Sequence, residues 1–169
     1  MPFLIALICI QHVIFYFVVG LRQDAGSFFT ALACNIITSW TSCSIGWFFG
    51  AMSGPEPKLA GQIASSILVP FLICAGALKS DLDTPIHLYP IKYLSWLRYG
   101  FSMMMVNEFK DLELECEEGV CPYNGTTILL DFGINPDELW WPNMPMNVLI
   151  GLGFIVLAWL ILTLKITRQ

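Results

Sequence analysis

The chain has 169 residues, of which 56% are hydrophobic and 12% are charged, and its mean hydropathy is +0.68. Soluble domains contain about 45–50% apolar and about 25% charged residues, so the composition argues against an ordinary soluble domain. The formal net charge is −5, and the acidity belongs to one loop, since the segment from Asp111 to Glu138 after Lys110 has eight acidic residues and no Lys or Arg. We therefore expect an all-α membrane protein, multi-pass and with membrane lipid as its surroundings, and no nucleic-acid partner.

Four apolar segments are long enough to be expected as membrane crossings, at residues 3–20, 28–52, 61–78 and 146–164. The first reaches about 27 Å at 1.5 Å per residue, close to the roughly 30 Å of a hydrocarbon core. It carries Gln11 and His12, which either mark a transport path or bond to a neighbouring helix. It lacks the basic start and cleavage site of a secretory signal, so we interpret it as a retained helix.

The next two crossings have distinct packing features. Asp24 or Ser27 can cap the second crossing, which is rich in small and hydroxylic residues. Several of these residues fall at helical spacing and are expected on one face of this helix: Asn35, Ser39, Ser42, Gly46 and Gly50. Gly46 and Gly50, four residues apart, favour close packing of helices within the bundle over a separate dimer motif. Pro70 lies inside the third crossing, where it is expected to kink the helix.

The segment between the third and last crossings, residues 79–145, is expected to contain a re-entrant amphipathic helix and an outer loop. Residues 91–109 have helical character but carry Lys92, Arg98 and Glu108. A charge at the bilayer centre costs about 2.5–3.5 kcal/mol on insertion scales, so this segment is not a plain lipid-facing crossing. Arg98 and Glu108 are each expected to pair within the bundle, which lowers their burial cost.

The outer loop carries chemistry typical of the extracellular or lumenal side. Cys116 and Cys121 are a predicted disulfide, although either could instead bond a partner subunit. Asn124 begins an Asn-Gly-Thr glycosylation sequon. Lys165 and Arg168 follow the last crossing, and the positive-inside rule then places the C-terminus in the cytosol. The remaining cysteines lie in apolar crossings and are expected as reduced thiols: Cys9, Cys34, Cys43 and Cys74.

Motifs for catalysis are missing from the sequence. It has no phosphate-binding loop, no G-x-G-x-x-G, no zinc-type Cys/His spacing and no G-x-S-x-G elbow. The acidic loop lacks EF-hand spacing and is interpreted as a solvated surface. We therefore predict a non-enzymatic chain that holds no cofactor or metal of its own.

Several stretches, taken together, resemble the White-type (G subfamily) ABC half-transporters. The signature-like residues are Arg98-Tyr99-Gly100-Phe101 and Asn107-Glu108-Phe109. The end of the first crossing, Tyr16-Phe17-Val18-Val19-Gly20-Leu21, looks like the third membrane helix of that family. The later crossings, the re-entrant segment and the loop match the remainder in order, so that the resemblance covers essentially the whole chain.

The resemblance implies the C-terminal two-thirds of an exporter's membrane domain, without its ATP-binding domain and first two helices. The family exports lipids, sterols, pigment precursors or other hydrophobic compounds, uses ATP and Mg in its full-length form, and pairs two halves as a homo- or heterodimer. It implies a plasma membrane or intracellular vesicle location. Its cavity-lining helix maps onto Leu68 and Leu72, and its upper apolar plug onto Ala77 and Leu78; ordinary core packing is the alternative for these four.

Two other interpretations of the sequence compete with the transporter resemblance. A small four-span scaffold of tetraspanin-like layout would carry a Cys-Cys-Gly motif in its large outer loop, and this chain has none. A truncated regulatory or scaffold protein that dimerises with full-length half-transporters would keep the same helices. The residues do not identify a substrate.

Overall fold

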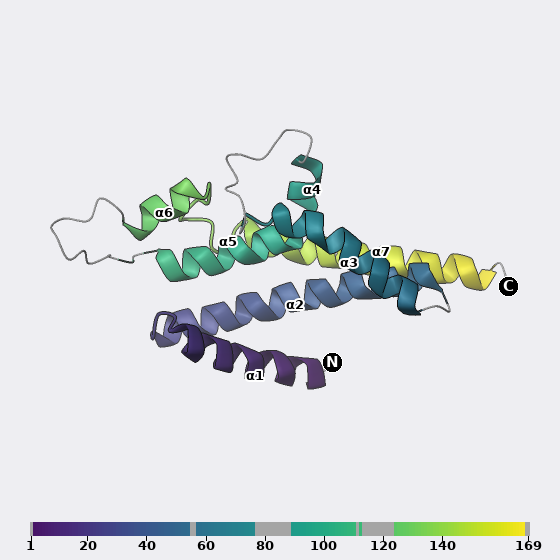
Figure 1. Cartoon of the computed structure of the whole chain (residues 1–169), viewed down its shortest axis with the longest axis horizontal. Coiled ribbons are helices and arrows are strands. Elements are labelled where there is room, and N and C mark those ends of the chain that lie inside the picture. Colours follow the sequence, from purple (N-terminus) through teal and green to yellow (C-terminus); the bar gives the residue numbers. More distant parts are fainter. Residues whose placement is uncertain (1, 55–56, 77–88, 111, 113–123, 168–169) are drawn as a thin grey trace.

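The computed structural model describes residues 2–54, 57–76, 89–110, 112 and 124–167 (Figure 1). All regular secondary structure in these ranges is helical, as the composition predicts. The helices are α1 (Pro2–Val19), α2 (Ala25–Ser53), α3 (Pro57–Ile73), α4 (Tyr89–Leu94), α5 (Trp96–Phe109), α6 (Gly125–Asp131) and α7 (Asn143–Thr167).

The helix ends shift by a few residues from the expected crossings. The second helix begins three residues earlier than expected because Asp24 caps it, with Asp24 Oδ2 accepting a hydrogen bond of 3.2 Å from the backbone N–H of Ser27. The third helix ends at Ile73 rather than residue 78. Its last turn tightens, since Ala75 N–H bonds to the carbonyl of Leu72 at 3.2 Å instead of continuing the helical pattern.

The long helices α2 and α7 lie side by side and run in the same direction (Figure 1). Thr41 on α2 meets Asn147 on α7 through a 3.2 Å hydrogen bond, and further along both helices the rings of Phe48 and Phe154 pack 5.3 Å apart. At their C-terminal ends, Lys165 donates hydrogen bonds to the α2 carbonyls of Ala51 and Met52. This lysine thus satisfies carbonyls that the end of a helix leaves unpaired.

Helices α3 and α5 both pack against α2, and α5 also packs against α7. The buried cluster between them consists of Ile45, Phe49, Phe71 and Trp96. Helix α1 folds back along α2 as a hairpin and diverges from it toward the N-terminus (Figure 1). Helix α6 caps the far end of α5, where Val106, Leu129 and Ile134 form a second cluster.

Hydroxylic side chains fit inside α2 because they bond back to their own helix. The hydroxyls of Thr38, Ser42 and Ser44 donate to carbonyls four residues earlier, at 2.9, 2.9 and 3.0 Å. A polar group in hydrocarbon is costly unless it is paired, and this local bonding removes that cost. The Ser-rich composition of α2 is therefore compatible with an apolar surrounding.

Close helix packing uses glycines other than those expected. A Cβ atom placed on Gly46 or Gly50 would have no neighbour within 4 Å among the described residues, so the prediction that this pair packs closely within the bundle is wrong. Gly100 on α5 and Gly151 on α7 make the close approaches instead. Their Cβ atoms would lie 2.7 Å from Thr38 Oγ1 and 2.8 Å from the Trp40 ring.

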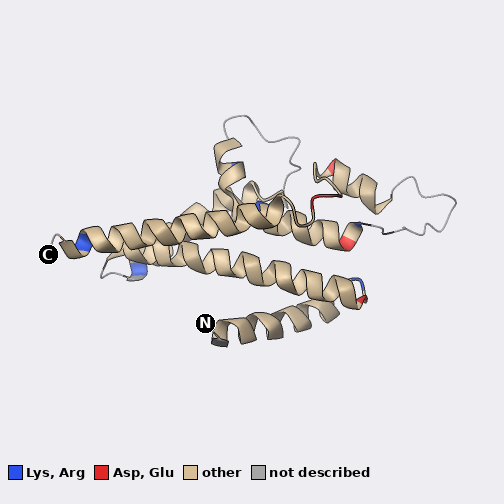
Figure 2. Ribbon diagram, turned by 180° about the vertical axis from the view of Figure 1, so that it is seen from behind, with Lys and Arg blue, Asp and Glu red and all other residues tan. Residues whose placement is uncertain are grey.

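Two helices, α2 and α7, are long and apolar enough to cross a membrane, whereas α1 and α3 are shorter apolar helices. Large apolar side chains are exposed along α1 and α7, including Phe17, Val18 and Leu149 at 65%, 80% and 60%. Most charged residues that the structure describes lie near helix ends (Figure 2). This distribution suits a molecule whose long sides contact lipid.

Candidate solute-binding groove

Two separate pockets lie one after the other along α2, each between α2, α3 and α5, and we call them the inner and outer chambers of a groove. The inner chamber has a volume of about 360 Å³. Its lining includes Ser42 and Gly46 from α2, Ser65 and Leu68 from α3, and Trp96 from α5. It lies toward the ends of α2 and α7 that Lys165 joins.

The outer chamber has a volume of about 250 Å³. It is lined by Asn35 and Thr38 from α2, by Leu72 from α3, and by Gly100 and Phe101 from α5. It lies nearer the turn between α1 and α2. The two chambers therefore follow one another along α2, each with walls from the same three helices.

The expected path residues of α3 lie at this groove. Leu68 lines the inner chamber and Leu72 lines the outer one, and their exposed fractions are 44% and 45%. Ala77 and Leu78 lie outside the described residues. Sequence reasoning missed the α2 and α5 walls, although Asn35 and Ser42 sit seven residues apart on one face of a helix.

The lining of both chambers contains apolar, hydroxyl and amide groups and no charged side chain among the described residues. An uncharged site of this kind favours apolar molecules, because an ion would lose its hydration without a compensating partner. The polar atoms of Asn35, Thr38 and Ser65 could bond to a hydroxyl or carbonyl of such a molecule. The groove therefore suits neutral, largely apolar solutes.

The start of α5 is anchored to three helices at once. Ser95 Oγ donates to the α3 carbonyl of Phe71 at 3.1 Å. The Trp96 indole N–H donates to Ser42 Oγ on α2 at 2.9 Å. Asn147 Nδ2, on α7, donates to the carbonyl of Trp96 at 3.3 Å. Both Ser95 and Asn147 are fully buried, so these bonds lie in the dry interior of the bundle.

Replacing Asn147 with alanine is expected to destabilise the bundle by about 1–2 kcal/mol, given the range of interhelical hydrogen bonds measured in membranes. The Asn147 amide also donates to Thr38 Oγ1 at 3.4 Å, so two bonds are lost together. The measurement is the midpoint of unfolding in a titration of dodecyl sulfate. Asn35→Ala, at a half-buried position, serves as the control, and an equal loss in both variants would contradict the anchoring role.

The two charged residues singled out on the segment expected to be re-entrant, Arg98 and Glu108, have different surroundings. The guanidinium carbon of Arg98 lies 5.5 Å from the ring centres of both Tyr93 and Tyr99, a geometry that stabilises a cation. Glu108 Oε1 accepts a 2.8 Å hydrogen bond from the backbone N–H of Arg22. Nearby, Asn107 Nδ2 donates to the carbonyl of Ser27 at 3.0 Å. The end of α5 is thus tied to the turn between α1 and α2.

The other residues of interest are only partly described. Cys116 and Cys121 lie outside the described residues, and the predicted disulfide between them stays a prediction. Asn124 is exposed and makes no capping hydrogen bond from its side chain, which leaves it accessible. Cys9, Cys34, Cys43 and Cys74 have free thiols, as expected from their apolar surroundings.

His12 and Gln11 separate on the two faces of α1. The His12 ring is buried, at 1% exposure, and its centre lies 5.1 Å from that of Phe28 on α2. Gln11 is exposed. The position of His12 favours helix packing over a transport path.

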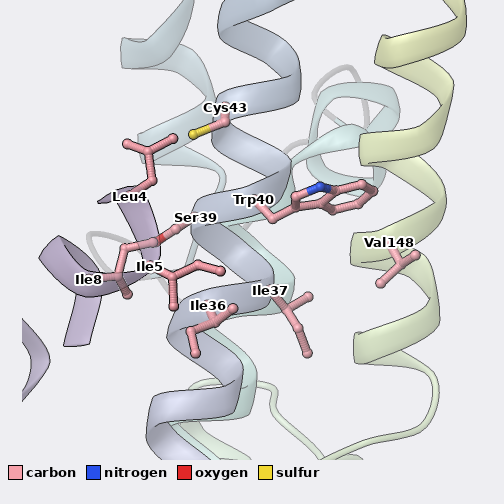
Figure 3. Close-up of a pocket in the computed structure, with 9 residues that line it drawn as sticks. All are labelled: Leu4, Ile5, Ile8, Ile36, Ile37, Ser39, Trp40, Cys43 and Val148. Atoms are coloured by element: carbon pink, nitrogen blue, oxygen red, sulfur yellow. The ribbon is translucent and has the colours of Figure 1, made fainter. Parts of the chain in front are cut away.

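A third cavity, of about 210 Å³, lies between α1, α2 and α7 on the other side of α2 (Figure 3). Leu4, Ile5 and Ile8 line it from α1, and Trp40 extends from α2 toward Val148 on α7 (Figure 3). Ser39 faces this cavity and not the groove, which corrects the expectation that it shares one face with Asn35 and Ser42. Of these three polar residues of α2, only Asn35 and Ser42 therefore face the groove.

Comparison with known proteins decides the family. The model of the ABC-2 type transporter membrane domain matches residues 1–109, a range that contains all three helices of the groove. The chain belongs to the ABC-2 type transporter family. This transporter domain is an integral membrane protein with a role in membrane transport, and its relatives place it among White-type G subfamily membrane domains.

The relatives are much longer than this transporter domain. It is 27% identical to Protein white of Drosophila melanogaster over 100% of this chain and 25% of that protein. It is 27% identical to Protein white of Ceratitis capitata over 91% of this chain and 23% of that protein. It is 30% identical to ABC transporter G family member 1 of Dictyostelium discoideum over 90% of this chain and 20% of that protein. The chain thus spans a quarter or less of these relatives.

Proposed function

We propose that this domain is the membrane-spanning part of an ATP-driven exporter of lipids, sterols, pigment precursors or other hydrophobic compounds. The observation that carries the proposal is the family match over the three helices that form an uncharged groove. ATP and Mg would act on an ATP-binding domain, for which this sequence has no motif. The residues of this domain would bind the solute, and its helices would change position in response to ATP binding and hydrolysis in that other domain.

We propose four crossings, by α1, α2, α3 and α7, with α5 as a re-entrant helix. At 1.5 Å per residue, α1 and α3 reach about 25–27 Å, at the short end of what spans a bilayer. Trp96, at the start of α5, bonds to Ser42 in the middle of α2, whereas Asn107, near its end, bonds to Ser27. Helix α5 therefore runs along α2 from its middle to its N-terminal end, which supports a re-entrant helix that extends from mid-membrane toward the outer surface.

The position of Lys165 supports a cytosolic C-terminus. Basic residues at the end of a membrane helix favour the cytosolic side, and Lys165 reaches the backbone at the adjoining end of α2. The location that we propose, from the resemblance to the family, is the plasma membrane or an intracellular vesicle membrane. Glycosylation at Asn124 would then occur on the opposite, lumenal side.

A second half-transporter, identical or related, is the partner that we propose. Val69, Leu72 and Ile73 form an apolar face of α3 that is 44–56% exposed in this chain. A solute path between two halves would use such a face together with the groove beside it. Membrane lipid contacts the remaining apolar sides.

The test is substitution of Leu72 in the complete transporter. Leu72→Ala is expected to change export between solutes of different size by about 10-fold or more, because a few methylene groups in an apolar site discriminate by that much. The measurement is ATP-dependent efflux of hydrophobic fluorescent compounds, with the amount of transporter at the cell surface determined in parallel. Leu149→Ala, at an exposed position on α7 that lines neither chamber, is the matched control. Unchanged selectivity in Leu72→Ala would contradict the proposal that solutes pass through the groove.

A further inference from the structure

A pocket walled by aromatic rings lies where α1 turns into α2, and we call it the aromatic cage. It has a volume of about 230 Å³. Its rings come from the end of α1 and the start of α2, and its polar rim comes from the turn between them. The lining includes Tyr16, Phe17, Phe28 and Phe29, with Gln23 and Asp24 in the rim. None of these residues lines either chamber of the groove, so the cage is a separate site.

The rings of the cage meet edge to face and do not stack. The ring centre of Phe28 lies 5.0 Å from that of Tyr16 and 5.5 Å from that of Phe29, with interplanar angles of 83° and 82°. The Tyr16 hydroxyl donates a hydrogen bond to the carbonyl of Arg22, which holds the turn beside the rings. Phe17 and Phe29 are 65% and 66% exposed, so two of the rings are open to a ligand.

The chemistry of the cage favours a methylated ammonium group. Aromatic faces attract cations, and cages of several rings bind quaternary ammonium ligands. Asp24 adds a negative charge at the rim, where it also caps α2 through Ser27 and offsets the partial positive charge of the helix N-terminus. A primary ammonium has three N–H donors that need acceptors, which rings do not supply well. A trimethylammonium group has no such donors and suits the cage better.

The place of the cage indicates that the cation belongs to a lipid. The turn ends α2, a helix long enough to cross a membrane, and charges of both signs gather there (Figure 2). Arg22 donates one hydrogen bond to the carbonyl of Lys110 at 3.2 Å, and a guanidinium has further N–H donors for a phosphate. Ile14 and Ile10 follow Phe17 at helical spacing along α1. They are 60% and 58% exposed and offer an apolar surface to acyl chains.

We propose that the aromatic cage binds the choline headgroup of a phosphatidylcholine molecule in the adjoining membrane leaflet. The trimethylammonium group lies against the rings near Asp24, the phosphate lies toward Arg22, and the acyl chains follow the exposed face of α1. This site goes beyond the proposed function, because the lipid is bound outside the groove. A lipid held in this way would fix the end of the α1–α2 hairpin at the membrane surface.

The test is native mass spectrometry of the complete transporter, purified in detergent and incubated with phosphatidylcholine or phosphatidylethanolamine of the same acyl chains. These lipids differ only in the methyl groups on the ammonium. The unaltered protein is expected to retain phosphatidylcholine about 10-fold better, the order of discrimination that cation–π contacts provide. Phe29→Leu removes a ring and keeps an apolar side chain, and Asp24→Asn removes the charge and keeps a capping residue. Each is expected to lose most of the preference.

Two further variants separate the cage from general effects on lipid contact. Phe29→Tyr keeps the aromatic face and is expected to keep the preference. Phe15→Leu, at an exposed phenylalanine of α1 that does not line the cage, is the matched control and is expected to leave the preference unchanged. Equal retention of both lipids by the unaltered protein, or an unchanged preference in Phe29→Leu and Asp24→Asn, overturns the proposal. Loss of the phosphatidylcholine adduct in an equal concentration of choline chloride would assign the cage to free choline and overturn the lipid assignment.

Discussion

Replacing Gly125 with alanine is expected to detach α6 from the end of α5. A Cβ atom at this position would lie 2.0 Å from the carbonyl oxygen of Phe109 and 3.1 Å from the side chain of Leu112. The obstacle is backbone, which cannot rotate away as a side chain can. Gly125 N–H also donates to the carbonyl of Leu112 at 3.0 Å, so any shift breaks a bond. We expect a cost of about 3 kcal/mol or more for this contact.

The measurement is hydrogen exchange of the backbone amides of α6 in the purified protein. Faster exchange in α6, with unchanged exchange in α2 and α7, is the expected result, because α6 packs on α5 and outside the main cluster. Leu130→Ala, at an exposed position of the same helix, is the control and is expected to leave exchange unchanged. Protection of α6 in Gly125→Ala equal to that of the unaltered protein would contradict the contact.

Replacing Gly100 with alanine is expected to force α2 and α5 apart. The new Cβ atom would lie 2.7 Å from Oγ1 and 2.8 Å from Cγ2 of Thr38. Thr38 is branched at Cβ and its hydroxyl bonds to the carbonyl of Cys34 at 2.9 Å, so it has little freedom to move. Overpacking of this kind costs about 1–3 kcal/mol.

Unfolding can be followed through the reactivity of the buried thiol of Cys34, which is 0% exposed. A thiol-reactive fluorophore is expected to report a lower melting temperature for Gly100→Ala. Gly153→Ala adds the same methyl group where nothing lies within 4 Å, and it should melt like the unaltered protein. The double variant Gly100→Ala with Thr38→Ala should recover part of the loss. No recovery in the double variant would show that Thr38 is not the obstacle.

The sequence predicted the helical class and most helix positions because long apolar runs leave few alternatives in lipid. Backbone groups in hydrocarbon must bond within their own segment, so runs such as residues 3–20 and 146–164 are helices wherever they pack. Asp24 was recognisable as a cap from its residue type and place. The helical character of residues 91–109 also followed from their pattern, although the break between Leu94 and Trp96 did not.

The candidate site was predicted less well, for a geometric reason. Leu68 and Leu72 were placed on one face of α3, and both line the groove. Which residues of α2 line the groove depends on the side of α2 that faces α3 and α5. Helical spacing grouped Ser39 with Asn35 and Ser42, whereas in the structure Ser39 lines the cavity between α1, α2 and α7. Gly46 and Gly50 matched a packing pattern, yet helices α5 and α7 approach α2 closely at Gly100 and Gly151, because contact requires a partner at the same height on another helix.

By itself the sequence determined that this chain forms apolar helices, that Asp24 can cap one of them, and which family it resembles, since these properties depend on composition and local order. The tertiary structure alone decided that Ser95, Trp96 and Asn147 anchor the start of α5 and that walls from α2 and α5 lie opposite Leu68 and Leu72. Asn147 and Trp96 are 51 residues apart, and contacts across such separations arise only when the helices have packed.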